Sequence, residues 1–467
     1  LAAALITYRP KSALRDIGRA LGFDSDRLNQ LTRNLAWWDR DVNLPERLQE
    51  AGFNPESPRV ALMLELTRTL IGFPRHLSQH TGGFVIARGK LSRLVPIENA
   101  AMAERTVIQW DKDDLEALGL LKVDVLALGM LTVIRKALVL IAQRRGQPFT
   151  MSDIPEGDRA TYAMLSRADS VGVFQVESRA QMSMLPRLKP RQFYDLVVQV
   201  AIVRPGPIQG DMVHPYLRRR EGKEAVARIS PAIDAVLQRT YGVPIFQEQV
   251  MQLAIVAAGF TPGEADQLRR AMASWKQKGH VQRFKEKLRE GMRAQGHPAE
   301  FAEALCRQIE GFGEYGFPES HAASFALLAY VSAWLKCHEP EAFLCALLDS
   351  QPMGFYAPAQ LLQDARRHGV EVLPVEVNAS AVDCGLILPR APRPAARPVV
   401  RLGLLQVAGL SAESAKAIVA AREQGAFLDV QDLAARAGLD AGQLRRLAEA
   451  DALSALVGHR RDAAWQV

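Results

Sequence analysis

The stretch GLLKVDVLALG, residues 119–129, places one lysine and one aspartate inside an otherwise apolar run. Successive side chains of a β-strand point to opposite faces, so Lys122 and Asp124 would share one face of a strand. The Val- and Leu-rich composition, ended by Gly129, predicts that this strand is buried in a core. A buried carboxylate is costly unless it is paired, hydrogen-bonded or bound to a metal. Asp124 is therefore a candidate functional residue.

The length and composition of the chain set its broad class. Its 467 residues, 48% of them hydrophobic, predict a large core and about three domains of roughly 150 residues each. The four cysteines lack the paired spacing of a metal site, so we interpret them as reduced, buried thiols of a cytoplasmic protein. No apolar stretch reaches the length of about 20 residues that crosses a membrane. The sequence starting at Leu1 resembles the interior of a domain, and we interpret the chain as a fragment.

Positive charge is concentrated in one part of the chain. The net charge is +7, and residues 261–295 hold nine Lys and Arg against four Asp and Glu. Such an excess predicts binding to a polyanion, of which nucleic acid is the leading candidate. The alternative is an ordinary solvated helix face.

A helix is predicted to begin inside this basic stretch. The motif TPGE at 261–264 combines an N-cap threonine, a proline at the first helical position and a glutamate that completes a capping box. The helix that follows would present Arg269, Arg270 and Lys276 on neighbouring positions. These cations are placed to meet a triphosphate or a DNA backbone, and composition does not separate the two uses.

Two further polar residues stand next to a stiff or an apolar segment. Arg204 stands in VRPGPIQG, where prolines stiffen the loop and glycines allow close backbone approach. Gln247 follows an apolar, strand-like piece in YGVPIFQEQVMQLA. A structural turn is the alternative interpretation of the first motif.

Two other catalytic classes are disfavoured. Ser320 and His321 are adjacent, but no GxSxG nucleophile elbow accompanies them, which argues against a hydrolase. His76 and His80 have the four-residue spacing of zinc ligands on a helix, but the glutamate of a HExxH motif is missing and QHTGG would end the helix directly after His80. A metalloprotease is therefore not expected.

The remaining pattern predicts a mainly helical protein. Residues 1–75 look helical, residues 80–130 contain short β-type runs, and helices dominate from 150 to about 375. Near the C-terminus, AGLS at 408–411 and AGLD at 437–440 each combine a turn glycine with a helix-capping residue. Such a pair is typical of helix-hairpin-helix units, which hold DNA phosphates through exposed amides. The alternative is an ordinary pair of capped helical turns.

Taken together, these motifs resemble one family. LGLLKVDVLALGMLTVI, GVFQVESRAQM, VRPGPIQG, YGVPIFQEQVMQLA, LRRAMASWK, YGFPESHAASFALLAYVSAWLK and LLQVAGLSAESAKAIVAAR occur in the order found in bacterial C-family DNA polymerases, which include the alpha subunit of DNA polymerase III. SQPMGFYAPAQLLQDARRHGVEVLPVEVN and other segments are similar to the error-prone, damage-tolerance branch. The resemblance implies a mainly α fold with a small α/β part: a partial palm like the nucleotidyltransferase fold of DNA polymerase beta, a helical thumb and fingers, and a C-terminal helix-hairpin-helix region.

The resemblance also implies a division of the chain into domains. Residues 1–79 would form the thumb with an edge of the palm, and residues 80–130 the returning part of the palm. The fingers would cover residues 131–388, a proline-rich linker residues 389–400, and a tandem helix-hairpin-helix region residues 401–467.

By the same resemblance, Asp124 matches the third metal-binding acid of the palm. It would help to hold Mg²⁺ beside the primer 3′ hydroxyl, in a two-ion arrangement with ions about 3.5–4 Å apart. Lys122 would neutralise phosphate charge. The residues implied to contact the nucleotide or DNA are Arg204, Gln247, Arg269, Arg270, Lys276, Gly409 and Lys416.

The implied function is DNA-directed DNA synthesis of the error-prone, translesion type, with primer-template DNA and deoxynucleoside triphosphates as substrates. A sliding clamp and accessory mutagenesis proteins are the implied partners, without a membrane. Two departures from the family qualify this expectation. The other two metal-binding aspartates would lie upstream of Leu1, so we expect the fragment alone to be inactive. Ser411 also replaces the second glycine of the hairpin. The alternative is a non-catalytic DNA-binding or scaffold module of a mutagenic repair complex.

Overall fold

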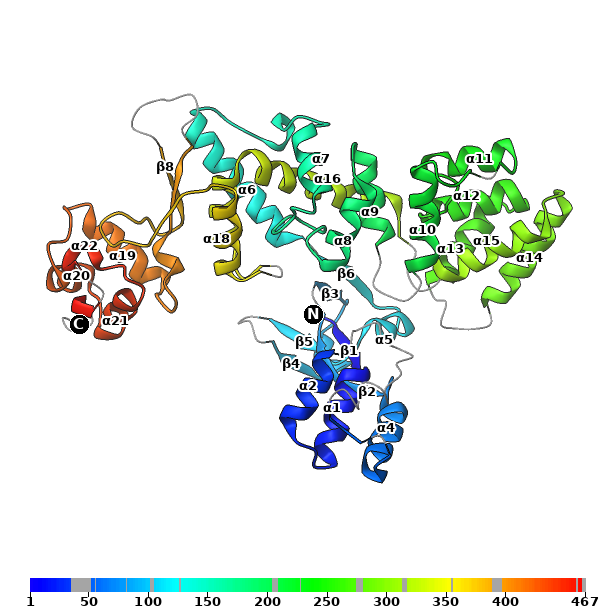
Figure 1. Cartoon of the computed structure of the whole chain (residues 1–467), viewed down its shortest axis with the longest axis horizontal. Coiled ribbons are helices and arrows are strands. Elements are labelled where there is room, and N and C mark those ends of the chain that lie inside the picture. The colour runs from blue at the N-terminus through cyan, green and yellow to red at the C-terminus, as the bar shows by residue number, and fades with distance from the viewer. Residues whose placement is uncertain are drawn as a thin grey trace. The chain divides into compact units, whose positions relative to one another are not determined.

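The structure is a computed structural model, and it divides the chain into two compact units, Leu1–Leu128 and Gly129–Val467 (Figure 1). Each unit is described by itself. The residues that the structure describes are 1–34, 52–54, 56–80, 82–100, 105–125, 127–203, 209–226, 228–273, 280–312, 317–353, 356–388, 397–458 and 461–463.

The first unit combines short antiparallel strand pairs with helices. Strand β1 pairs with β2, β3 with β6, and β4 with β5. The strands are β1 Ala3–Thr7, β2 Pro74–Gln79, β3 Gly83–Ile86, β4 Ile97–Asn99, β5 Thr106–Ile108 and β6 Leu121–Asp124. The helices are α1 Pro10–Ala20, α2 Ser25–Asn34, α4 Pro58–Leu70, α5 Lys112–Ala117 and the 3₁₀ turn η1 Leu91–Arg93.

Two small apolar clusters hold this unit together. One lies between α1, α2 and α4 and includes Leu14, Leu28 and Met63. The other lies beside β5 and includes Ile108 and Leu115. The expectation of a purely helical segment up to residue 75 is wrong at both ends, because β1 and the start of β2 lie within it. Their pairing joins residues about 70 positions apart, which a helical periodicity does not report.

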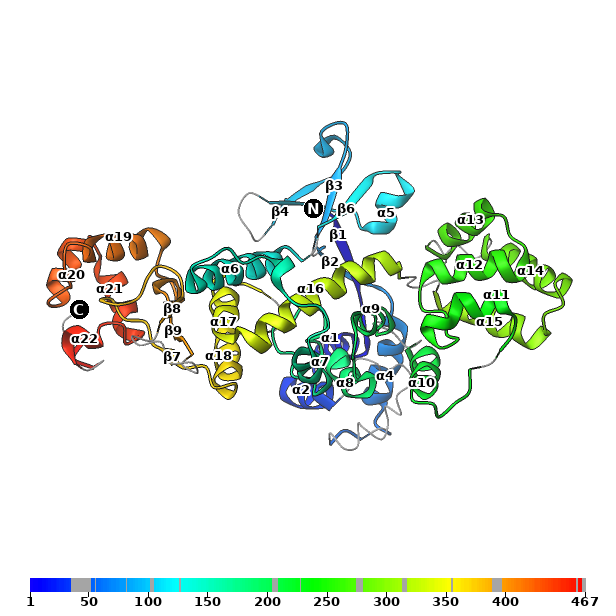
Figure 2. The same cartoon turned by 90° about the horizontal axis from the view of Figure 1, so that it is seen from above.

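The second unit is mainly helical, as predicted. Its long central helix α16, Glu319–His338, packs against α9, Phe193–Ile202, and is buried along its second half (Figure 2). The other elements up to residue 367 are α6 Leu128–Arg145, η2 Met151–Asp153, α7 Arg159–Ser166, α8 Arg179–Leu188, α10 Gln209–Arg220, α11 Pro231–Leu237, η3 Gln238–Thr240, α12 Gln247–Ala258, α13 Pro262–Ala273, α14 His280–Ala294, α15 Ala299–Phe312, α17 Pro340–Leu348 and α18 Pro358–Arg367.

Helices α12 and α14 meet at an unusually close point. A β-carbon placed on Gly291 of α14 would lie 2.1 Å from the carbonyl oxygen of Ala258, the last residue of α12. That separation is far inside van der Waals contact, so only glycine allows the two backbones to touch here. Helix α12 is tied in turn to α16, because Glu248 Oε2 accepts a hydrogen bond of 2.9 Å from the backbone amide of Glu319.

The C-terminal part of this unit has its own apolar cluster. A small sheet of order β7–β9–β8 comes first, with β7 Val372–Leu373, β8 Gly385–Ile387 and β9 Val399–Arg401. The helices that follow are η4 Leu404–Gln406, α19 Ala412–Arg422, α20 Val430–Ala437, α21 Ala441–Glu449 and α22 Ser454–Val457. Most of the proline-rich stretch lies outside the described residues, but β9 returns the chain to the sheet that it left at β8.

Two other expectations can be compared with the structure. Among the described residues, the helices all fall short of the length and apolarity needed to traverse a bilayer. All four cysteines are free thiols; Cys306, Cys345 and Cys384 are buried, as predicted, and Cys337 is half-buried.

Candidate active site and nucleic-acid-binding residues

Lys122 and Asp124 share one face of strand β6, as the alternation of a strand predicts. The ammonium group of Lys122 donates to both carboxylate oxygens of Asp124, at 2.7 and 2.8 Å. His80 Nδ1 lies 3.9 Å from the same carboxylate, but it accepts hydrogen bonds from the amides of Gly82 and Gly83. An accepting nitrogen carries no proton, so Lys122 is the cation that neutralises Asp124.

The predicted burial of this strand is wrong. The Asp124 side chain is 45% exposed, and the apolar face of β6 is open, with Leu121 at 60% and Val123 at 38% exposure. The sheet has two strands, and β3 places Phe84 and Ile86 opposite these residues on the same open face. The apolar run therefore reflects an uncovered face within the described unit, and the strand ends at Asp124 instead of continuing to the glycine.

The metal-binding capacity of this position is limited. Mg²⁺ is bound in proteins through one or two carboxylates together with water and substrate phosphates. Asp124 offers one such carboxylate, and Lys122 occupies it. The groups of three ligand side chains found among the described residues do not include Asp124. The described residues alone therefore do not form a site for two ions.

Helix α13 begins as predicted. The amide of Glu264 donates to Thr261 Oγ1 at 3.3 Å, and Glu264 Oε2 accepts from the amide of Thr261 at 3.0 Å, which completes the capping box. Further along the helix, Asp266 binds two arginines. Its carboxylate lies 2.9 Å from Arg269 Nη2 and 2.8 Å from Arg270 Nη2. These hydrogen bonds, with the two charges, lower the pKa of Asp266.

Ion pairs neutralise part of the positive charge that the sequence concentrates in residues 261–295. Besides the arginines on Asp266, Lys287 pairs with Glu264, and Arg289 Nε lies 2.6 Å from Glu303. Arg270 still extends into solvent, with a side chain 74% exposed. The part of the predicted site formed by Lys276 and Arg204 lies outside the described residues.

Gln247 is the first residue of α12, where its amide donates to the carbonyl oxygen of Phe317 at 3.2 Å. Its side chain is half-buried. Its neighbour Gln249 has a structural role, because its buried amide bonds the backbone of Ile245 and the hydroxyl of Thr240, both at 2.8 Å.

The C-terminal turns have the predicted caps. Gly409 adopts φ of +78°, and Ser411 Oγ accepts from the amide of Ser414 at 3.0 Å at the start of α19. Asp440 caps α21 in the same way through the amide of Gln443. The side chain of Gln443 donates to Ser414 Oγ at 2.8 Å, so the two capped helix starts lie side by side.

The surroundings of these turns are polar and partly cationic. Lys416 is exposed on α19. The guanidinium of Arg446 lies across the Gly409 turn, 2.5 Å from where a β-carbon would stand. The carboxylate of Asp440 already occupies the start of α21, so the α19 start is the better place for an anion.

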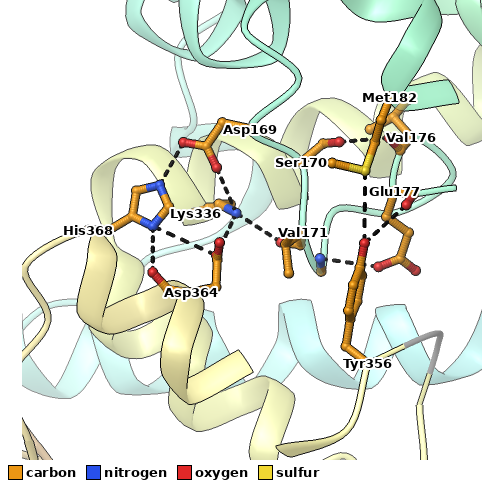
Figure 3. Close-up of polar contacts among 11 residues, drawn as sticks. Asp169, Ser170, Val171, Val176, Glu177, Met182, Lys336, Tyr356, Asp364 and His368 are labelled. Carbon is orange, nitrogen blue, oxygen red and sulfur yellow. Dashed lines mark hydrogen bonds and ion pairs between the residues drawn. The ribbon is translucent and has the colours of Figure 1, made fainter. Parts of the chain in front are cut away.

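A buried ionic cluster lies inside the second unit, and the sequence did not indicate it (Figure 3). Lys336 of α16 is 5% exposed and lies 3.0 Å from Asp169 and 2.8 Å from Asp364. It also donates to the carbonyl oxygen of Val171 at 3.0 Å. His368 Nε2 completes the cluster, 2.6 Å from Asp169. The ammonium of Lys336 lies between the two carboxylates and neutralises their charge.

The ionisation of the cluster follows from these contacts. Burial alone would raise the pKa of Asp169, but the charges of Lys336 and His368 and their hydrogen bonds hold that pKa below its ordinary value. Burial alone would lower the pKa of His368, and its bonds to Asp169 and Asp364 outweigh this, so the pKa is raised. Nearby, burial raises the pKa of Glu177 to about 7, against a hydrogen bond from the amide of Gly172.

Three family models match successive parts of the chain. The model described as the bacterial DNA polymerase III alpha NTPase domain matches residues 1–127, and that of the bacterial DNA polymerase III alpha subunit finger domain matches residues 130–296. A helix-hairpin-helix motif matches residues 369–463.

Curated relatives are similar along the whole chain. An error-prone DNA polymerase of Azoarcus sp. is 70% identical over all of this chain and 44% of its own length. Error-prone DNA polymerases of Dechloromonas aromatica and Methylococcus capsulatus are 65% and 63% identical, over 45% and 46% of their lengths. The chain thus spans less than half the length of the curated relatives that it matches.

Proposed function

This chain belongs to the bacterial DNA polymerase III alpha family, and on that premise we propose that it forms part of an error-prone, DNA-directed DNA polymerase. The enzyme would add deoxynucleotides to a primer 3′ end during synthesis past DNA damage. The observation that carries this proposal is the identity of 63–70% to error-prone DNA polymerases over the full length of the chain. The division into thumb, palm, fingers and hairpin region remains a prediction.

In the proposed reaction, Asp124 supplies one carboxylate of the metal site. When bound, Mg²⁺ would lower the pKa of the primer hydroxyl and stabilise the leaving pyrophosphate. The carboxylates that complete the site would come from elsewhere in the complete polypeptide. Lys122 lies on the same strand face, so its ammonium is placed to exchange Asp124 for a substrate phosphate as the site fills.

The second unit would supply the remaining contacts. Arg269 and Arg270 project from α13 with a shared carboxylate, and we propose that they bind the triphosphate. Gln247, Arg204 and Lys276 remain proposed contacts of the nucleotide or template. The amides around Gly409, with Lys416, would hold a phosphate of the duplex without reading sequence. Association with a sliding clamp and accessory proteins is part of the same proposal.

Primer extension by the complete polypeptide that carries this sequence tests the function. Asp124→Asn keeps the side-chain volume and removes the charge, so templated incorporation should fall by at least about a hundredfold in kcat while primer-template affinity is retained. Glu116→Gln is the matched control, an exposed carboxylate on α5 of the same unit. Normal incorporation by Asp124→Asn would remove this residue from the reaction. Absence of templated incorporation by the unmodified polypeptide, with DNA binding intact, would favour the scaffold alternative.

A further inference from the structure

A strained turn presents Gln175 at the surface of the second unit. The amide of Val176 donates to the carbonyl oxygen of Phe174 at 2.8 Å, so the hydrogen bond closes around the single residue Gln175. Gln175 is exposed and has φ of +63°. A turn of this kind with positive φ is rare and strained. Such conformations persist only where the surroundings fix them, and they cluster at functional sites.

The structure fixes this turn from several directions. We call residues 169–177 the anchored loop (Figure 3). Buried Lys336 holds its Val171 carbonyl, and the carboxylate of Glu177 accepts from the amide of Gly172 at 3.1 Å. Three hydroxyl groups complete the anchoring: Ser170 Oγ donates to Val176 O at 2.7 Å, Tyr356 donates to Glu177 O at 3.2 Å, and Ser332 Oγ accepts from Phe174 N at 3.2 Å.

A row of aromatic rings leads away from the anchored loop along α16. The ring of Phe174 lies 5.2 Å from that of Phe325, which lies 4.2 Å from His321, and His321 lies 5.0 Å from Phe317. We call these four side chains the ring row. His321 and Phe325 are four residues apart and share one face of α16, and Phe317 lies four residues before His321, just ahead of the helix. None of the contacts is a parallel stack, since the interplanar angles are 76°, 47° and 48°.

The ring row is partly open to solvent. His321 is exposed, and the three phenylalanines are half-buried. Partial desolvation lowers the pKa of His321, which disfavours the charged imidazolium. Rings that served the core alone would be covered, as Tyr162 and Trp334 are in the same unit.

We propose that the ring row and Gln175 together form a surface on which the bases of single-stranded nucleic acid stack. Aromatic side chains bind bases of any sequence through their faces, and a carboxamide can bond the polar edge of a base. The strained turn and the rings are independent observations that meet at Phe174. The inference rests on the proposed polymerase function, since it assigns a base-binding surface to the finger region.

A comparison of two oligonucleotides tests this surface. The 467-residue chain would be titrated with a fluorescent oligothymidylate about 20 nucleotides long and with an abasic strand of the same length. Both carry the same phosphates, but only the first can stack. We expect the unmodified chain to bind oligothymidylate about tenfold more tightly than the abasic strand.

Two substitutions separate the ring from the volume it occupies. Phe325→Leu keeps an apolar side chain, so the chain should fold but lose most of the preference for the base-bearing strand. Phe325→Tyr keeps the ring and should retain the preference. Leu327→Ala is the matched control, because Leu327 is 46% exposed two residues further along α16. Thermal unfolding of each variant verifies its folding.

Equal affinity of the unmodified chain for the two strands would overturn the proposal, and so would a preference that Phe325→Leu leaves intact. A ring row that binds a protein or a second copy of the chain would give equal affinities and a changed sedimentation coefficient on Phe325→Leu, which also overturns it. None of these outcomes touches templated incorporation by the complete polypeptide, so failure here is distinguishable from failure of the proposed function.

Discussion

Lys122 holds both carboxylate oxygens of Asp124, at 2.7 and 2.8 Å, on the exposed end of a two-stranded sheet. A cation approaching this carboxylate must displace or outcompete the ammonium. In the proposed function, this pair would therefore govern how readily Asp124 binds a metal ion.

Lys122→Met should change metal dependence and turnover in opposite directions. Removal of a positive charge next to Asp124 should lower the half-saturating Mg²⁺ concentration for primer extension about fivefold, which corresponds to about 1 kcal/mol at this exposure. Loss of the phosphate-binding charge should lower kcat about tenfold or more. Steady-state extension by the complete polypeptide across a Mg²⁺ series measures both. Lys112→Met, at an exposed lysine of α5, is the control, and a turnover that stays normal in Lys122→Met would exclude the proposed role.

Arg269→Ala should raise the KM for deoxynucleoside triphosphates about tenfold, because a charged hydrogen bond contributes about 1.5–3 kcal/mol. The same substitution at Lys287, which pairs with Glu264 in the same basic stretch, should have little effect. Single-nucleotide incorporation by the complete polypeptide provides the measurement. Equal changes in the two variants would mean that general positive charge, and not this position, matters.

Lys416→Ala should weaken binding to duplex DNA uniformly across sequences. Loss of one phosphate contact should also reduce the slope of log affinity against log salt concentration by about 1. Fluorescence anisotropy over a salt series measures this slope. Arg367→Ala, an exposed cation on α18, serves for comparison, and an unchanged slope for Lys416→Ala would remove α19 from the DNA contact.

Glu177→Gln should stabilise the fold at alkaline pH. Burial raises the pKa of Glu177 to about 7 from the ordinary 4.5, so the native state binds the proton more tightly than the unfolded state does. The contribution of Glu177 to stability is therefore fully present below about pH 4.5 and is lost as the pH rises through about 7. The amide variant lacks this titration, and its oxygen can still accept from Gly172.

At pH 8 we expect the free energy of unfolding of Glu177→Gln to exceed that of the unmodified chain by on the order of 2 kcal/mol, and at pH 4 the difference should vanish. Urea unfolding at both pH values measures it. Glu156→Gln, at an exposed carboxylate, should show no such pattern. A Glu177→Gln variant that is destabilised equally at both pH values would contradict the expected pKa.

Gln175→Gly should separate stability from function. Glycine adopts positive φ without strain, so the free energy of unfolding should rise by about 1 kcal/mol, while the preference for base-bearing oligonucleotides should fall. Asp451→Gly is matched to it, since Asp451 is exposed with φ of +59°. That variant should be stabilised without a change in oligonucleotide preference. Loss of stability in Gln175→Gly would show that the side chain itself holds the turn.

Local chemistry was predicted well from the sequence. The capping box at Thr261 and Glu264, and the caps at Ser411 and Asp440, are confirmed because each depends on residues within one helical turn. The alternation that places Lys122 beside Asp124 is confirmed for the same reason.

Predictions about burial and charge were less successful. An apolar run in the sequence does not show whether another element packs on that face of the strand. The predicted burial of Asp124 was wrong for this reason, since its side chain is 45% exposed. The prediction of a basic surface used the number of charged residues in the sequence and not their ion-pair partners. Carboxylates such as Asp266 and Glu303 neutralise part of that positive charge. The cluster around Lys336 joins Asp169 and Asp364 across 167 and 28 residues, which no local pattern connects. The roles of the nucleotide-binding candidates remain predictions.

At Gly291 and Ala258 the backbones of α12 and α14 are in direct contact, with no side chain between them. The two helices are therefore expected to move together. Helix α12 is fixed in turn to the first turn of α16 through Glu248. The same α16 carries His321 near that end and Lys336 near the other. A displacement of the outer helices would therefore be passed along α16, whose Lys336 bonds the carbonyl of Val171 in the loop that presents Gln175.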